Sequence, residues 1–215
     1  MTGALASLTE ALGLTTSPRQ AGALLDYLAL MQQWNATYNL TAVRDPGAML
    51  IQHLADCLAI VPAVRRELPA GRLMDVGSGG GLPGVVLAIM LPTLAVTCVD
   101  AVGKKAAFIR QAAGTLALSN LQAVHARVET LRAEPFDLIT SRAFACLADF
   151  AAWTAPLLAP GGRWLAMKGK SPIAELAALP TTVEVFHVEH LTVPQLDAER
   201  CLVWMRPAPT LDTPR

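Results

Sequence analysis

The sequence predicts an α/β fold, in which a helical N-terminal segment precedes a doubly wound, seven-stranded and mostly parallel sheet. From residue 72 onward, short apolar runs alternate with helical segments. A glycine cluster follows the first of these runs directly, and before residue 70 apolar residues recur at helical spacing. We therefore divide the chain into a helical segment packed on the core (1–70), a ligand-binding domain (71–207) and a flexible tail (208–215).

The composition is that of a globular chain with one substantial core. Of its 215 residues, 53% are hydrophobic and 16% are charged, which excludes a disordered chain. The net charge is zero, so nucleic acid would have to be recognised by a local basic patch. The chain begins without the features of a signal peptide, and its best apolar stretch, 85–91, is too short to span a membrane. We expect a cytoplasmic protein with no membrane partner.

The four cysteines are far apart in the sequence, and none has a partner at the spacing of a metal site. We predict that all of them are small buried residues, with no disulfide and no bound metal. They are Cys57, Cys98, Cys146 and Cys201.

Two dipeptides before residue 70 are typical of helix starts. Ser17-Pro18 and Asp45-Pro46 each combine a capping side chain with a proline in the first helical turn. A polar loop around 39–41 separates the two predicted helices. His53 falls on the apolar face of the second helix, and we interpret it as a core residue rather than a catalyst.

The later part of the chain predicts seven strands and four helices. The last two strands have no convincing helix between them, so we expect them to pair antiparallel. The predicted strands are 72–76, 95–100, 121–125, 136–141, 163–168, 183–189 and 200–206, and the predicted helices lie near 84–91, 103–117, 145–158 and 172–179.

The turn after the first strand carries most of the functional information. The strand ends at Gly77, and the run continues through Gly79 to Pro83, where a helix is expected to begin. A strand, a glycine turn and a helix bring bare backbone and the positive end of a helix dipole against a nucleotide-like ligand. The spacing Gly79-x-Gly81-x-x-Gly84 matches the dinucleotide fingerprint, but that pattern alone is weak.

Two aspartates favour a cationic nucleoside over a dinucleotide. Asp75 lies just before the glycines, where a carboxylate would repel a pyrophosphate but tolerate an ammonium and a sulfonium. The turn D-V-G-x-G resembles motif I of class I methyltransferases, which bind S-adenosylmethionine. Asp100 ends the second predicted strand, at the distance where a carboxylate accepts the ribose hydroxyls. The alternative for Asp100 is a cap on the following helix.

Eight segments in order carry a more specific resemblance. The chain resembles the RsmG (glucose-inhibited division protein B) family, whose members methylate N7 of a guanine in small-subunit ribosomal RNA. The segments are W-N-x-x-Y-N-L-T at 34–41, R-D-P at 44–46, H-L-x-D-C-L at 53–58, D-V-G-S-G-G-G-L-P-G at 75–84, K-K-x-x-F-I at 104–109, R-V-E at 127–129, S-R-A-F-A at 141–145 and A-M-K-G at 166–169.

The resemblance implies a class I (Rossmann-like) methyltransferase fold, S-adenosylmethionine as the cofactor and 16S ribosomal RNA, in a partly assembled small subunit, as the partner. The cofactor residues expected on this basis are Gly77, Gly79, Leu82, Asp100, Ala101, Val102, Val128, Glu129 and Arg142. The residues expected to meet RNA are Asn39, Arg142, Lys168 and Lys170, with Arg163 joining the two lysines in a small basic cluster.

The expected chemistry needs no general base. The lone pair of guanine N7 is free in the neutral base, so alignment and exclusion of water suffice. We assign Arg142 a positioning role. The fourth strand carries neither a Pro-Pro-Tyr turn for an exocyclic amine nor a Pro-Cys nucleophile. Two alternatives remain from the sequence: a class I methyltransferase acting on a protein or small molecule, and an NAD-dependent oxidoreductase.

Overall fold

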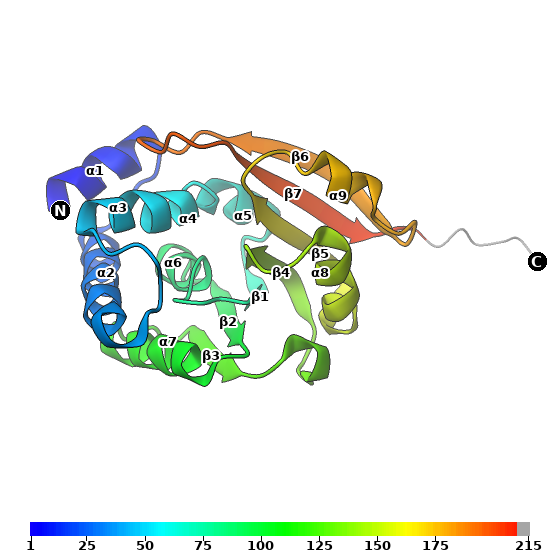
Figure 1. Ribbon diagram of the computed structural model, residues 1–215, viewed down its shortest axis with the longest axis horizontal. Coiled ribbons are helices and arrows are strands. Elements are labelled where there is room, and N and C mark those ends of the chain that lie inside the picture. The colour runs from blue at the N-terminus through cyan, green and yellow to red at the C-terminus, as the bar shows by residue number, and fades with distance from the viewer. Residues whose placement is uncertain (210–215) are drawn as a thin grey trace, which may run out of the picture.

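A computed structural model, which describes residues 1–209, has a seven-stranded sheet between two layers of helices (Figure 1). The strand order is β3-β2-β1-β4-β5-β7-β6. β7 pairs antiparallel with both of its neighbours, and the other pairs in the sheet are parallel. The strands are β1 (Gly71–Val76), β2 (Leu94–Asp100), β3 (Leu121–His125), β4 (Phe136–Arg142), β5 (Leu158–Lys168), β6 (Val183–Leu191) and β7 (Arg200–Pro207).

The predicted doubly wound sheet with its closing antiparallel pair is confirmed, and one strand boundary is wrong. β5 begins at Leu158 rather than at residue 163. Leu158 pairs with Phe136, and the register then shifts so that Leu138 pairs with Arg163. The intervening Pro-Gly-Gly sequence looks like a turn but forms an irregularity inside the strand. From residue 210 on, the predicted tail lies outside the described residues.

Side chains on the two faces of the sheet belong to two separate clusters of buried residues. On β1, Leu73 belongs to the cluster shared with the N-terminal helices, α6 and α7, whereas Met74 packs toward α8. The helices are α1 (Thr2–Ala11), α2 (Pro18–Tyr38), α3 (Pro46–Met49), α4 (Asp56–Leu58), α5 (Val61–Glu67), α6 (Gly84–Met90), α7 (Gly103–Thr115), α8 (Leu147–Thr154) and α9 (Ile173–Ala177), with a π-helical turn at Leu50–Ala55 and 3-10 turns at Val128–Thr130 and Ala155–Leu157.

Helix α2 contacts the sheet domain at both ends of α6. The helix start predicted from Ser17-Pro18 is confirmed, and Ser17 also forms a reciprocal capping box with Gln20. The amide of Gln20 also donates to the Ile89 and Met90 carbonyls at the end of α6, at 3.1 and 3.3 Å. Further along α2, the hydroxyl of Tyr27 donates to the Gly80 carbonyl in the glycine turn. Helix α2 therefore holds the glycine turn in place through Tyr27.

By length and composition alone, the 22-residue helical stretch Pro46–Glu67 could cross a membrane, since its most apolar 18-residue window has a mean hydropathy of 1.6. Our expectation that no stretch reaches that length is wrong, because isolated polar residues such as His53 and Asp56 interrupt the apolar run without lowering its average hydropathy enough. Of its most apolar window, 72% is buried inside the protein. It serves here as a core helix.

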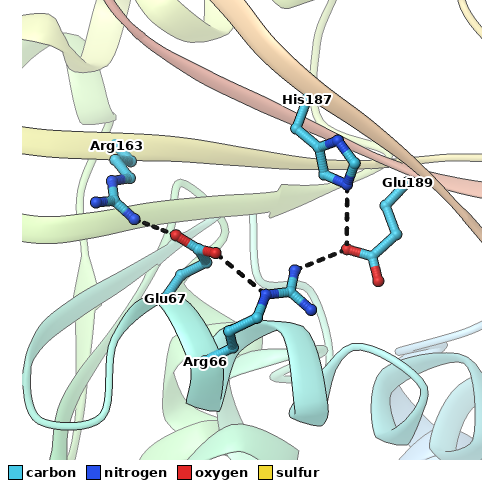
Figure 2. A network of polar contacts seen from close by, with 5 residues as sticks. All are labelled: Arg66, Glu67, Arg163, His187 and Glu189. Carbon is cyan, nitrogen blue, oxygen red and sulfur yellow. Dashed lines mark hydrogen bonds and ion pairs between the residues drawn. The ribbon is translucent and has the colours of Figure 1, made fainter.

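A polar network on the outer part of the sheet joins α5 to two strands (Figure 2). Arg66 pairs with Glu67 at 3.1 Å and with Glu189 at 3.0 Å, and Glu67 also binds Arg163. His187 lies 3.9 Å from Glu189. These side chains are between 25% and 53% exposed, so solvent screens the charges and each pair contributes little alone.

Arg163 therefore does not belong to the basic cluster that we expected around Lys168. The two residues are separated by five positions on one strand, which at about 3.3 Å per residue is about 17 Å. Cys146 is the other correction: the remaining three cysteines are buried, but Cys146 is exposed. Its Sγ accepts from the Asp149 N–H at 3.5 Å, because it caps α8.

Replacing Gly84 by alanine should destabilise the fold. A Cβ there would overlap Cys98 Sγ and lie 2.9 Å from the Asp75 carboxylate, so the first turn of α6 would have to move off the sheet. We expect a loss of about 1–3 kcal/mol in urea unfolding. Gly114→Ala is the control: it lies in α7 with open space around its Cβ and should be neutral or stabilising by up to about 1 kcal/mol. Equal effects of the two substitutions would contradict the packing argument.

Candidate functional site

The glycine turn between β1 and α6 is shaped by two glycines with different roles. Gly77 has φ +67°, and a Cβ there would collide with the ring of Phe144. Gly79 has φ +58°, but its missing Cβ points into open space, with nothing but the Gly77 carbonyl within 4 Å. Gly77 thus allows close packing, whereas Gly79 leaves room for a ligand to approach the backbone.

Two carboxylates hold the turn from beneath. Asp75 is fully buried, and its Oδ2 accepts from the Gly84 N–H at 2.9 Å. Burial raises the pKa of Asp75 to about 7. Our expectation that Asp75 tolerates a cationic ligand directly is therefore wrong, because the alternation of β1 points this side chain at the start of α6. The favourable contact of an acid with a helix N-terminus explains its position.

Asp100 is not the N-cap of α7, which is Val102, and its role toward ribose stays a prediction. Its Oδ1 accepts from the Val102 N–H and its Oδ2 from the Gly79 N–H, each at 2.8 Å. The bond to Val102 closes the turn that leads into α7, and the bond to Gly79 fixes the glycine turn. Because each carboxylate oxygen has two lone pairs, Asp100 keeps acceptor capacity toward the cavity that it lines.

Two adjoining cavities open at the carboxyl edge of the sheet, where ligands bind in open α/β folds. The first has a volume of about 460 Å³ and lies between the glycine turn, the N-terminal helices and the ends of β4, β5 and β7. The second, about 340 Å³, lies over the ends of β1 to β3 and the segment 126–129. Gly77 and Ala143 line both, so the cavities meet there.

Most of the predicted site residues line these cavities. Gly77, Gly79, Leu82, Arg142 and Lys168 line the first cavity, and Gly77, Asp100, Ala101, Val128 and Glu129 line the second. Val102, Asn39 and Lys170 line neither. Val102 is exposed beside the second cavity, and the Asn39 side chain accepts from Arg44 at 3.2 Å. The roles assigned to all of these residues stay predictions.

Lys168 differs from the solvated cation that an RNA contact would require. Its ammonium donates to the Ala145 carbonyl at 3.1 Å and to Glu175 at 2.8 Å. These bonds connect the end of β5 to α9, and the carboxylate of Glu175 offsets the positive charge of Lys168. Lys170, two residues further on, is exposed.

Sequence reasoning missed the ionic centre of the first cavity. Asp56 accepts from Arg142 Nη1 at 3.1 Å through Oδ2 and from Arg200 Nε at 2.7 Å through Oδ1. The carboxylate side chain is only 4% exposed, and among the described residues that line this cavity it is the single acidic one. The segment H-L-x-D-C-L at 53–58 contains Asp56, but nothing in it indicates the two arginine partners. In the structure a π-helical turn, often found at functional sites, directly precedes Asp56.

A second overlooked group shapes the loop beside this cavity. Thr41 Oγ1 lies 2.7 Å from His53 Nε2, and the backbone N–H of Thr41 donates to Asn35 at 2.9 Å. Burial and the charge of Arg142 lower the pKa of His53, so its ring is neutral near pH 7. His53 is thus buried as predicted, but it also lines the cavity.

No group of three or more His, Cys, Asp and Glu side chains within residues 1–209 is arranged to hold a metal ion. The profile of the family described as rRNA small subunit methyltransferase G matches residues 20–203 of the sequence. The chain belongs to this family.

Proteins named ribosomal RNA small subunit methyltransferase G are similar to the chain over nearly its whole length. The one from Acidovorax sp. (strain JS42) is 62% identical over 214 residues, covering 95% of this chain and 94% of the relative. The one from Leptothrix cholodnii is 58% identical, covering 92% of each. The similarity to these relatives thus extends over the N-terminal helices as well as over the sheet.

Solved structures of lower identity share the class I methyltransferase fold. TrmN from Thermus thermophilus has a TM-score of 0.56 at 21% identity, covering 70% of this chain and 48% of that one. The 1,6-didemethyltoxoflavin-N1-methyltransferase of Burkholderia thailandensis has a TM-score of 0.58 at 16% identity, covering 91% and 92%. The predicted fold class is confirmed.

The raised pKa of Asp75 predicts a pH-dependent stability. The folded chain binds the Asp75 proton more tightly than the unfolded chain, whose carboxyl has the ordinary pKa of 3.8. Stability from this group is therefore present below about pH 4 and is lost as the pH rises to about 7. Asp75→Asn keeps an acceptor for the Gly84 N–H but carries no charge. In urea unfolding, the variant should gain stability relative to wild type as the pH rises through this window. A difference independent of pH would show that Asp75 titrates normally.

Proposed function

We propose that this protein transfers the methyl group of S-adenosylmethionine to N7 of a guanine in 16S ribosomal RNA. The observation that carries the proposal is the pair of cavities that meet at Gly77 and Ala143. The second cavity offers the carboxylate of Asp100, as a nucleoside requires, and the first combines the open backbone of Gly79 with cationic side chains from β4, β5 and β7. Family membership favours an RNA substrate over the alternatives of a protein, a small molecule or a nicotinamide cofactor.

The residues of the second cavity fit the adenosine part of the cofactor. The free acceptor capacity of Asp100 suits the two ribose hydroxyls. Val128 is buried and Glu129 exposed beside the same cavity, where an apolar surface and a polar rim would hold an adenine ring. The open backbone at Gly79 leaves space for the methionine part. Bound there, S-adenosylmethionine supplies an electrophilic methyl group.

The remaining task of the protein is alignment. A neutral guanine needs no deprotonation at N7, and the neutral His53 is held by Thr41 rather than aimed as a base. The cavity walls would place the base at the junction of the cavities, where Arg142 borders both reactants. Holding the reacting atoms in line and free of water accounts for the rate enhancement. As N7 becomes alkylated the purine gains positive charge, and the carboxylate of Asp56 offsets the cations beside it.

We further propose that the substrate is a partly assembled small ribosomal subunit in the cytoplasm. The net charge of the chain is zero, so affinity for naked RNA has to come from a few local cations. A folded particle adds shape complementarity to that contact. We propose that the methyl transfer proceeds without a metal ion.

The proposal predicts a defined product. Small subunits from cells that lack this protein, incubated with the purified enzyme and methyl-labelled S-adenosylmethionine, should acquire label in one 16S nucleotide. Nuclease digestion should yield that label as 7-methylguanosine. Label in ribosomal protein, or in another methylated nucleoside, would contradict the proposal. Deproteinised 16S RNA, tested in parallel, should be the poorer substrate.

The open space at Gly79 predicts a selective loss of cofactor binding. Gly79→Ala places a Cβ where the ligand passes, whereas Gly13→Ala adds a Cβ at a similar φ of +63° with nothing nearby. Both substitutions carry the same backbone strain. We expect Gly79→Ala to weaken S-adenosylmethionine binding by about tenfold or more in calorimetry, equivalent to about 1.4 kcal/mol, and Gly13→Ala to leave it unchanged. Equal affinities for the two variants would remove Gly79 from the cofactor site.

A further inference from the structure

One face of α2 carries a stripe of large side chains that runs from the glycine turn to the end of the helix. Tyr27, Met31, Trp34 and Tyr38 recur at intervals of three or four residues, so they share that face. Tyr27 binds the Gly80 carbonyl and Met31 lines the first cavity, and both side chains are fully buried. At about 1.5 Å per residue, Tyr38 lies about 10 Å further along the helix than Met31. There the stripe leaves the core, and Tyr38 is 43% exposed.

The exposed ring of Tyr38 is supported by a row of rings. Its centroid lies 4.9 Å from that of Trp34, at an interplanar angle of 38°. Trp34 in turn packs edge-on against Phe108 of α7, with centroids 5.5 Å apart, and Phe108 is fully buried. Within residues 1–209 no other aromatic ring contacts Tyr38. A ring that is held on one side in this way loses little freedom when a ligand stacks on its other side.

The chain that follows Tyr38 leads directly into the first cavity. Leu40 and Thr41 line this cavity. Two residues span at most about 7 Å, so Tyr38 lies at the rim. Asn35 holds the loop against α2, because its side-chain oxygen accepts from the Thr41 N–H at 2.9 Å. The position of Tyr38 relative to the cavity is therefore fixed by the protein.

The surroundings of Tyr38 suit a single base of RNA better than an apolar protein segment. The next residue, Asn39, is exposed and accepts from Arg44 at 3.2 Å. Arg44 is exposed too, and within residues 1–209 its Nε and Nη1 groups bind no acceptor. A protein segment needs an extended apolar surface, whereas a base needs one aromatic face. One exposed ring between polar and cationic neighbours meets the second requirement.

We propose that Tyr38 stacks on the nucleotide next to the target guanine in the ribosomal RNA. The inference rests on the proposed function and adds a substrate contact to it. A guanine that enters a cavity leaves its base stack, so the neighbouring base loses a stacking partner. An aromatic ring at the rim replaces that partner. In the segment W-N-x-x-Y-N-L-T, Trp34 then supports the stacking ring and Asn35 fixes the loop beside it.

The test replaces Tyr38 with side chains that differ in their aromatic face. Tyr38→Leu keeps an apolar side chain without that face, Tyr38→Phe keeps the face without the hydroxyl, and Tyr38→Trp enlarges the face. For each variant we would measure binding across a salt series, both to small subunits from cells lacking the enzyme and to deproteinised 16S RNA. Calorimetry would give the affinity for S-adenosylmethionine. Circular dichroism would verify folding, which should be preserved because Tyr38 is exposed in the last turn of α2.

We expect Tyr38→Leu to bind both subunits and RNA about tenfold more weakly, the usual loss for a base stacked on an aromatic ring. The slope of log affinity against log salt should not change, because the ring carries no charge. Tyr38→Phe should bind within about twofold of wild type, and Tyr38→Trp at least as tightly as wild type. All three variants should keep the wild-type affinity for S-adenosylmethionine.

Four results would overturn the inference. Wild-type binding by Tyr38→Leu would show that the aromatic face contacts no base. An equal loss in Tyr38→Leu and Tyr38→Phe would assign the contact to the hydroxyl. A loss confined to subunits would assign Tyr38 to a ribosomal protein, and a parallel loss of cofactor affinity would show that the change acts through the glycine turn. Wild-type protein that forms no 7-methylguanosine would instead refute the proposed function, independently of how the Tyr38 variants bind.

Discussion

The first cavity, which we propose as the substrate side of the site, depends on the buried carboxylate of Asp56, which binds one arginine from β4 and another from β7. A buried ion is expensive to desolvate and is retained where its partners are well placed. Here the carboxylate comes from the helical segment that precedes the sheet, so the sheet alone cannot complete the cavity. The same segment supplies His53, Thr41 and the Gln52 carbonyl that also accepts from Arg142.

The proposed cofactor side is organised by hydrogen bonds to the backbone rather than by charge pairs. Asp75 fixes the start of α6, Asp100 holds the Gly79 N–H, and the Tyr27 hydroxyl binds the carbonyl of the next glycine. These contacts come from two strands and from α2. The turn is therefore held in its binding shape by the protein itself, which reduces the ordering that a ligand would otherwise have to bring about.

The sequence carried enough information for the sheet, because buried strands, helix caps and glycine turns are local patterns. It misplaced the start of β5, since Pro160 and the glycines after it resemble a turn. Contacts distant in sequence were out of reach: Asp56 and Arg200 are 144 residues apart, and nothing local indicates that they meet. Lys168 and Glu175 are only seven residues apart, but their pairing depends on how α9 folds back, which no local pattern indicates. The sequence thus indicated that Arg142 and Lys168 lie at the carboxyl edge of the sheet, but it did not indicate the residues that they pair with.

The central claim is that the cofactor and the guanine occupy the two joined cavities and react where these meet. A crystal structure with bound S-adenosylhomocysteine tests it most directly. We expect the ribose hydroxyls on Asp100, the adenine beside Val128 and the sulfur at the junction formed by Gly77 and Ala143. An adenosine group placed in the first cavity, against Arg200, would contradict the assignment of both cavities.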